Sequence, residues 1–380
     1  MLHCSKVLFD VNVVAFFSSS QVTRTMVDRP SQSKKRQRTT TPPLLELQDL
    51  RVHYHTKRGP VKAVDGLDME LKAGERYGLI GESGSGKSTL ALAIMRMIKP
   101  PGEIVGGRVL LDGVDLLTLS EEQMRRRRLA DVAMVMQGAM NSLNPVIRIR
   151  ELIADGLRNH NSPLKGEAMN AHIADLLTRV GLRPDVAQMY PHELSGGMKQ
   201  RVCIAIAISL YPKLIIADEP TSALDVVVQR QVMQTLRKVQ EELGAAVILI
   251  GHDMGLMAQF ADRIGVIYAG RVVEESPVRE LFERPQHPYS QLLMASLPRL
   301  DEKGAFHAAQ GSPPSLLDLP PGCVFHPRCP HRIERCTVEE PEIQFVGDRH
   351  RAACHLLENG QSLEQVIAEQ GAGREETVRP

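Results

Sequence analysis

The sequence predicts an α/β fold built around a parallel β-sheet, and three observations lead to this prediction. Two short runs, Leu214–Ala217 and Ala245–Ile250, are continuously apolar and bounded by polar residues, as in parallel strands buried on both faces. A third apolar segment, Arg76–Gly81, runs directly into a glycine-rich loop that is followed by a helical pattern. Helical segments such as Gln229–Leu243 lie between the strands, and this alternation is typical of a doubly wound sheet.

Composition excludes several classes of protein. The chain has 380 residues, 43% of them apolar and 24% charged, as in an ordinary globular protein. Its 46 Lys and Arg against 45 Asp and Glu give a net charge of +1, which argues against a nucleic-acid binder. No apolar run reaches the ~18 residues that suggest a membrane span. We therefore expect a cytosolic protein that neither binds nucleic acid nor crosses a membrane.

The chain divides into segments of different character. Residues 1–43 are rich in Ser, Thr and Gln with a basic run, and we expect a disordered leader. Alternating segments between residues 44 and 71 predict antiparallel strands. Strand signals vanish between about 140 and 200, where helical patterns predict an insertion into the core. A main domain over 44–276 is then followed by a Cys-rich region over 277–356 and a flexible tail over 357–380.

A phosphate-binding loop follows the strand Arg76–Gly81. The segment Gly81-Glu82-Ser83-Gly84-Ser85-Gly86-Lys87-Ser88 matches G-x-x-x-x-G-K-[ST] and lies between a predicted strand and a helix. Its glycines allow backbone N–H groups to surround phosphate oxygens, and the helix directs its positive end to the same place. Lys87 is expected on the β- and γ-phosphates and Ser88 on Mg²⁺. The predicted ATP contacts here are Gly81, Ser83, Gly84, Ser85, Gly86, Lys87, Ser88 and Thr89.

Two adjacent carboxylates end the strand Leu214–Ala217. In α/β folds ligands bind at the carboxyl ends of the strands, where Asp218 and Glu219 would lie. We expect Asp218 to hold Mg²⁺ and Glu219 to polarise the attacking water as a general base. Together with the loop, these carboxylates predict hydrolysis of ATP.

A second glycine-rich helix start, Leu194-Ser195-Gly196-Gly197-Met198-Lys199-Gln200-Arg201, precedes that strand, although a single site needs only one phosphate cradle. With this segment the chain resembles the ATPases of ABC transporters over about residues 44–270. The resemblance implies a P-loop NTPase cassette with a RecA-like parallel core, an antiparallel β subdomain and a helical insertion. It also implies two cassettes facing head to tail, in which Ser195, Gly196 and Gly197 contact the γ-phosphate bound by the partner.

The same resemblance implies roles for four residues outside these loops. Tyr54 would stack on adenine, and Gln137 would sense Mg²⁺ and the attacking water. Asp225 would belong to the loop that links the two sites, and His252 would hold the γ-phosphate and pair with Glu219. The catalytic residues predicted in this way are Glu219, His252, Gln137 and Lys87.

Further stretches resemble the ATPases of dipeptide and oligopeptide importers, namely Ser142–Pro145, the Met198 that follows the glycine pair, His287–Tyr289 and Cys323–Pro330. Ala139 departs from the proline usual at its position. This resemblance implies a peripheral subunit on the cytoplasmic face of the inner membrane. Its implied partners are a second ABC ATPase subunit in a heterodimer, two transmembrane permease subunits and an extracytoplasmic solute-binding protein. An importer of nickel or sugar oligomers, or a soluble ABC ATPase without a transport role, stays open as an alternative.

Four cysteines, Cys323, Cys329, Cys336 and Cys354, crowd the last predicted region. Their spacing, C-x₅-C-x₆-C-x₁₇-C, lacks the C-x₂-C pairs of structural zinc sites, although four thiolates suit either zinc or an iron–sulfur cluster. The subgroup resemblance implies a [4Fe–4S] cluster on these four residues. Zinc, with histidines such as His326, His331, His350 or His355 as substitute ligands, and free or oxidised thiols stay open. So does a sensor that gates the ATPase.

Overall fold

The structure, a computed structural model, describes residues 42–296, 311–357 and 362–368. The predicted leader and the predicted tail therefore lie largely outside the described residues. The division of the chain into segments at 43, 276 and 356 stays a prediction.

A four-stranded antiparallel sheet is formed by the first part of the described chain. Its strand order is β2-β1-β4-β5, and the alternation of apolar residues between 44 and 71 places buried leucines on one face. That face packs on helix α1, with which it shares a hydrophobic core. The elements are β1 (Leu45–Thr56), β2 (Gly59–Leu71), β4 (Gly102–Leu111), β5 (Val114–Asp115) and α1 (Lys87–Ile94).

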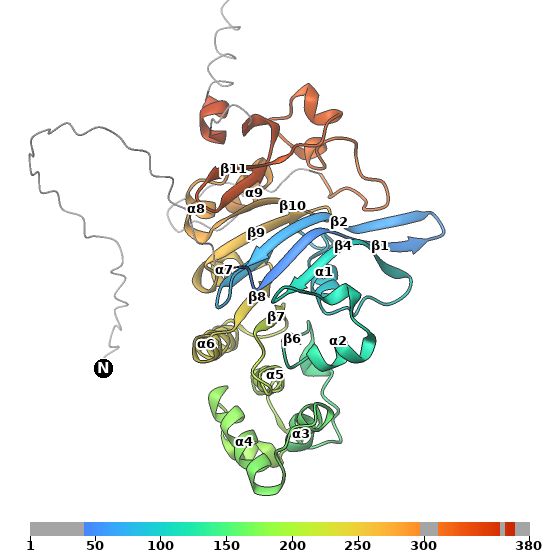
Figure 1. Cartoon of the computed structure of the whole chain (residues 1–380). Coiled ribbons are helices and arrows are strands. Elements are labelled where there is room, and N and C mark those ends of the chain that lie inside the picture. Colours follow the sequence, from blue (N-terminus) through green and yellow to red (C-terminus); the bar gives the residue numbers. More distant parts are fainter. Residues whose placement is uncertain (1–41, 297–310, 358–361, 369–380) are drawn as a thin grey trace, which may run out of the picture. The chain divides into compact units, whose positions relative to one another are not determined.

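An eight-stranded sheet forms the centre of the molecule, in the order β11-β12-β10-β9-β3-β8-β7-β6 (Figure 1). Five neighbouring strands are parallel, and the last three in sequence are antiparallel. The parallel strands are β3 (Arg76–Ile80), β6 (Val132–Val135), β7 (Leu214–Asp218), β8 (Ala246–Ile250) and β9 (Arg263–Tyr268). The antiparallel strands are β10 (Arg271–Pro277), β11 (Ile343–Gly347) and β12 (His350–Ala353).

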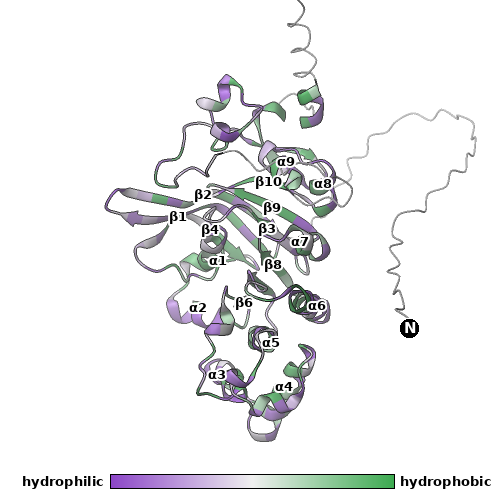
Figure 2. Ribbon diagram, turned by 180° about the vertical axis from the view of Figure 1, so that it is seen from behind, coloured by the Kyte–Doolittle hydropathy of each residue, from purple (hydrophilic) through white to green (hydrophobic). Residues whose placement is uncertain are grey.

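The parallel sheet lies between two hydrophobic cores. Along β7, Leu214 and Ile216 point into one core and Ile215 and Ala217 into the other. The residues of β8 alternate in the same way. Both strands are buried at every position, which explains their continuous apolar runs and the largely green central strands of Figure 2. The predicted α/β core is confirmed.

Helices cover the sheet and fill the stretch in which strand signals vanish. No strand lies between β6 and β7, a stretch that the structure describes throughout. Within the unit that begins at residue 41, α3 and α4 lie on the opposite side of the large sheet from the C-terminal hairpin (Figures 1 and 2). The remaining helices are α2 (Glu121–Arg127), α3 (Ile149–Asn159), α4 (Gly166–Arg179), α5 (Gly196–Ala207), α6 (Val226–Leu243), α7 (Met254–Phe260), α8 (Val278–Glu283) and α9 (Pro288–Ala295). Short 3₁₀ helices span Leu116–Thr118, Ala139–Asn141, Pro184–Gln188, Pro191–Glu193, His326–Arg328, Glu334–Thr337 and His355–Leu357.

The Cys-rich region is joined to the main sheet. Its hairpin of β11 and β12 pairs with β10, with Glu274 opposite Ala352 and Glu275 opposite Arg351. The sequence pattern did not predict these two strands. The segment after residue 277 therefore extends the cassette sheet by two strands.

Candidate nucleotide-binding and catalytic site

Close backbone contacts require glycine in the loop between β3 and α1. A Cβ atom on Gly81 would lie 2.2 Å from the carbonyl oxygen of Ile267, and one on Gly86 would lie 2.1 Å from that of Ala63. Gly86 also has a φ of +104°, a conformation that L side chains rarely adopt. The glycines thus allow the loop to pack tightly against the neighbouring backbone of Ile267 and Ala63.

Lys87 lies within this loop, and its side chain is buried. The ammonium donates to the carbonyl oxygens of Gly81 at 2.8 Å and Glu82 at 2.9 Å. Burial lowers the pKa of Lys87, whereas the nearby carboxylates of Glu219 and Asp218 act in the opposite direction. The loop therefore holds a positive charge at its centre, as a phosphate site requires.

Asp218, at the end of β7, is buried next to the start of α1. Its carboxylate accepts a hydrogen bond from the Ser88 hydroxyl at 3.2 Å. Burial raises the pKa of Asp218, and the charge of Glu219 acts in the same direction. A buried carboxylate beside a hydroxyl is a fitting oxygen donor set for Mg²⁺.

Three predicted catalytic side chains meet at the carboxyl ends of adjacent strands. Gln137 follows β6, Glu219 follows β7 and His252 follows β8. The Gln137 amide donates to Glu219 at 2.7 Å, and His252 Nδ1 lies 3.7 Å from the other carboxylate oxygen. Glu219 has a φ of +45°, a strained conformation that costs ~1–3 kcal/mol and is common at functional sites. The cluster therefore has the arrangement that positioning of a water molecule requires.

The glycine pair at the start of α5 forms a second group. Ser195 caps the helix by accepting a hydrogen bond from the Met198 N–H at 3.3 Å, and its side chain is exposed. A Cβ on Gly197 would lie 2.4 Å from a methyl group of Val228 on α6, the helix that Asp225 caps. Within the described residues, no hydrogen bond or ion pair joins this group to the phosphate loop. Tyr54 lies on β1, opposite Gly102 of β4.

The four clustered cysteines line one small cavity together with His326, His331 and His355. Burial raises the pKa of both Cys329 and Cys354 to about 12. Across the described ranges, however, no group of three or more His, Cys, Asp or Glu side chains is arranged to hold a metal ion. The prediction of a metal centre, iron–sulfur or zinc, is therefore not supported by the arrangement of side chains.

His350 does not line this cavity, contrary to its expected place near the cysteines. It lies on β12, 2.7 Å from Glu274 and 3.1 Å from Glu280. This buried contact holds the C-terminal hairpin to β10 and α8.

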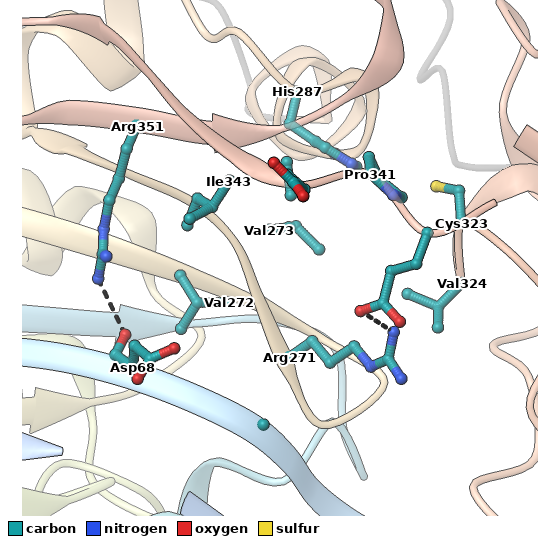
Figure 3. Close-up of a pocket in the computed structure, with 14 residues that line it drawn as sticks. Asp68, Arg271, Val272, Val273, His287, Cys323, Val324, Pro341, Ile343 and Arg351 are labelled. Atoms are coloured by element: carbon teal, nitrogen blue, oxygen red, sulfur yellow. Dashed lines mark hydrogen bonds and ion pairs between the residues drawn. The ribbon is translucent and has the colours of Figure 1, made fainter. Parts of the chain in front are cut away.

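A cavity of about 530 Å³ between β2, β10 and the C-terminal region has no counterpart in the sequence patterns (Figure 3). Its two arginines are paired: Arg271 forms an ion pair with Glu340, and Arg351 donates a hydrogen bond to the backbone carbonyl oxygen of Asp68 at 2.9 Å. None of its 14 lining residues belongs to the predicted ATP site. It joins residues that are distant in the chain, so no local signal indicates it.

Comparisons with known proteins agree with the motifs. Residues 64–222 match the family described as ABC transporter, and residues 273–336 match the oligopeptide/dipeptide transporter C-terminal region. The dipeptide transport ATP-binding protein DppD of Haemophilus influenzae is 43% identical over 84% of this chain and 98% of its own length. The chain belongs to the ABC transporter ATP-binding proteins. The oligopeptide transport ATP-binding protein OppD of Salmonella typhimurium is 44% identical over 83% of this chain and 94% of its own.

Solved structures confirm that the fold is an ABC cassette. A dimeric ATP-binding cassette in a post-hydrolysis state, bound to ADP and phosphate, is 29% identical, with a TM-score of 0.56 over 62% of this chain and 99% of that one. A component of a cbiONQ ABC transporter from Clostridium perfringens is 27% identical, with a TM-score of 0.55 over 64% of this chain and 91% of its own. In the described part of this ABC ATP-binding protein, no helix has the length and apolar character needed to cross a bilayer.

Proposed function

We propose that this ABC ATP-binding protein hydrolyses ATP and so energises the import of dipeptides or oligopeptides through separate membrane subunits. The convergence of Gln137, Glu219 and His252 at the ends of three adjacent strands carries the enzymatic part of the proposal. The hydrogen bond from Ser88 to Asp218 joins this edge of the sheet to the phosphate loop. The peptide substrate is supported by the printed functions of the dipeptide and oligopeptide transport relatives.

In this proposal the residues of the site share the binding of ATP and the activation of water. Lys87 and the backbone N–H groups of the loop neutralise the phosphates, and Ser88, Gln137 and Asp218 hold Mg²⁺. Glu219 accepts a proton from the attacking water, and His252 contacts the γ-phosphate. Because Gln137 and His252 flank the two oxygens of Glu219, they orient the base before the nucleotide binds.

The site is completed by a second cassette. Ser195 and Gly196 are exposed, and their helix makes no hydrogen bond to the phosphate loop among the described residues, so they are free to face a partner. The similar cassette bound to ADP and phosphate is dimeric. We infer a heterodimer with a second ATPase subunit, bound to two permeases on the cytoplasmic face of the inner membrane and served by an extracytoplasmic solute-binding protein.

We also propose that the cysteine cavity holds a [4Fe–4S] cluster on Cys323, Cys329, Cys336 and Cys354. All four side chains line one cavity, but among the described residues they are not arranged to hold a metal ion, so ligation would require them to draw together. When bound, such a cluster supplies iron–thiolate bonds that cross-link the segment. Purification without oxygen should give a brown protein with about four iron atoms per chain. A colourless or zinc-loaded sample would overturn this assignment.

The ATP site is tested by Lys87→Ala in the assembled transporter. ATP binding and peptide-stimulated hydrolysis should be lost, because the buried ammonium of the loop is removed. Lys238→Ala, which removes an exposed lysine on α6, is the matched control and should leave turnover unchanged. Normal hydrolysis by the Lys87 variant would refute the site. Uptake of a radiolabelled dipeptide that continues in cells carrying this variant would refute the transport role.

A further inference from the structure

Glu82, the second residue of the phosphate loop, is held at all three of its polar groups. Its N–H donates to the Tyr289 hydroxyl at 2.9 Å, and its carbonyl oxygen accepts from the Lys87 ammonium at 2.9 Å. Its carboxylate accepts two hydrogen bonds from the Arg328 guanidinium, at 2.8 and 2.9 Å. The residue that touches Lys87 is therefore fixed by two side chains, Tyr289 and Arg328, that lie between β10 and β11 in the chain.

Arg328 lies in the Cys-rich segment, one residue before Cys329 and 246 residues after Glu82. Its side chain is 6% exposed, and the two-pronged geometry is the one in which an arginine fixes a carboxylate most firmly. The Tyr268 hydroxyl accepts a further hydrogen bond from it at 3.2 Å, and the guanidinium lies over the tyrosine ring.

An aromatic cluster supports this contact. The ring centroids of Tyr268 and Tyr289 are 4.6 Å apart, and Phe325 lies 5.2 Å from the first and 5.4 Å from the second. Phe325 comes from the same segment as Arg328 and is fully buried. Since the interior is closely packed, a shift of this segment would displace the partners of Glu82.

We propose that Arg328 is a positioning residue for ATP binding, holding Glu82 so that the loop presents Lys87 to the phosphates. The inference rests on the proposed ATP site. It gives the Cys-rich segment a role in nucleotide affinity although the segment need not touch the nucleotide. Couplings of this kind between two sites typically change an affinity by about 5- to 150-fold.

The test is a comparison of ATP dissociation constants for the purified full-length chain with Mg²⁺. Arg328→Gln should raise the constant roughly tenfold. In the assembled transporter KM for ATP should rise while kcat at saturating ATP changes little, which a general loss of stability would not produce. Arg328→Lys, which keeps the positive charge but cannot donate two parallel hydrogen bonds to the carboxylate, should give an intermediate dissociation constant. Arg279→Gln, which breaks an exposed pair with Glu283 in the same part of the chain, should behave as the wild type.

A double-mutant cycle with Glu82→Gln tests whether Arg328 affects ATP binding through Glu82. The double variant should bind ATP no more weakly than either single variant, because both remove the same contact. Wild-type affinity in Arg328→Gln, or additive losses in the double variant, would overturn the inference. If Arg328→Gln does not fold, Glu82→Gln in the intact chain must show the loss, and wild-type affinity there overturns it. Normal binding by Lys87→Ala refutes the ATP site itself, whereas loss in that variant alone refutes only the role of Arg328.

Discussion

Replacing Glu219 with glutamine separates hydrolysis from binding. The glutamine side chain has nearly the same shape, and its oxygen can still accept the hydrogen bond that Gln137 donates at 2.7 Å. The substitution also removes one of the charges that raise the pKa of the buried Asp218, so Mg²⁺ and ATP should still bind. What is lost is the base, which contributes about 10²- to 10⁴-fold to such reactions. That range corresponds to about 2.7–5.4 kcal/mol of barrier.

Single-turnover hydrolysis of radiolabelled ATP by the assembled transporter measures this loss. We expect the rate of Glu219→Gln to fall about 10²- to 10⁴-fold, while the dissociation constant for ATP stays close to that of the wild type. Glu241→Gln, on the exposed side of α6, is the control for the chemical change and should hydrolyse normally. A Glu219→Gln rate within a few-fold of the wild type would show that another group accepts the proton.

Substitutions at four further positions test the packing and the ligand contacts. Asp218→Asn should abolish Mg²⁺-dependent hydrolysis yet stabilise the nucleotide-free protein by about 0.5–2 kcal/mol in thermal unfolding at neutral pH. That gain in stability should vanish at acid pH, where the Asp218 carboxyl is protonated in both the folded and the unfolded protein. A lower unfolding midpoint for the variant than for the wild type at neutral pH would contradict this prediction. Gly84→Ala should lower the free energy of unfolding by about 1–2 kcal/mol because of its positive φ alone. Gly86→Ala should lower it by roughly 3 kcal/mol or more, because the added Cβ would lie 2.1 Å from the Ala63 carbonyl oxygen. Equal losses in the two variants would refute this packing. Tyr54→Ala should weaken ATP binding by about 1–3 kcal/mol, whereas Tyr54→Phe, which keeps the aromatic ring, should not. Equal ATP affinities of Tyr54→Ala and the wild type would show that the ring does not stack on adenine.

Local signals were sufficient for the strands that lead to Gly81, Asp218 and His252, whereas the expected roles of Gln137 and His252 came from the family resemblance. The strand before Gly81, the buried run before Asp218 and the run before His252 each carry their own pattern of hydrophobicity. Parallel strands bring their carboxyl ends to one edge, so the approach of Glu219 to Gln137 follows once the strands pair. This part of the structure depends on short segments that fold as their own sequences direct.

Local patterns of this kind did not predict contacts between residues that are distant in the chain. The pairing of β12 with β10 buries polar side chains such as Glu274 and His350, which a hydrophobic pattern would place at the surface. The ion pair of Arg328 with Glu82 joins residues 246 positions apart. The cysteine spacing indicated a common site, and the side chains do share a cavity, but the sequence alone did not show that they would lack the arrangement of a metal site. Contacts of these kinds are decided by tertiary packing.

The head-to-tail use of the two glycine-rich segments is tested most directly by a cryo-electron microscopy map of the complete transporter carrying Glu219→Gln, with ATP and Mg²⁺. The map should show Gly81–Ser88 around one triphosphate and Ser195–Gly197 of the same chain against a different triphosphate, held by the partner cassette. Both segments of one chain on the same nucleotide would contradict the proposal.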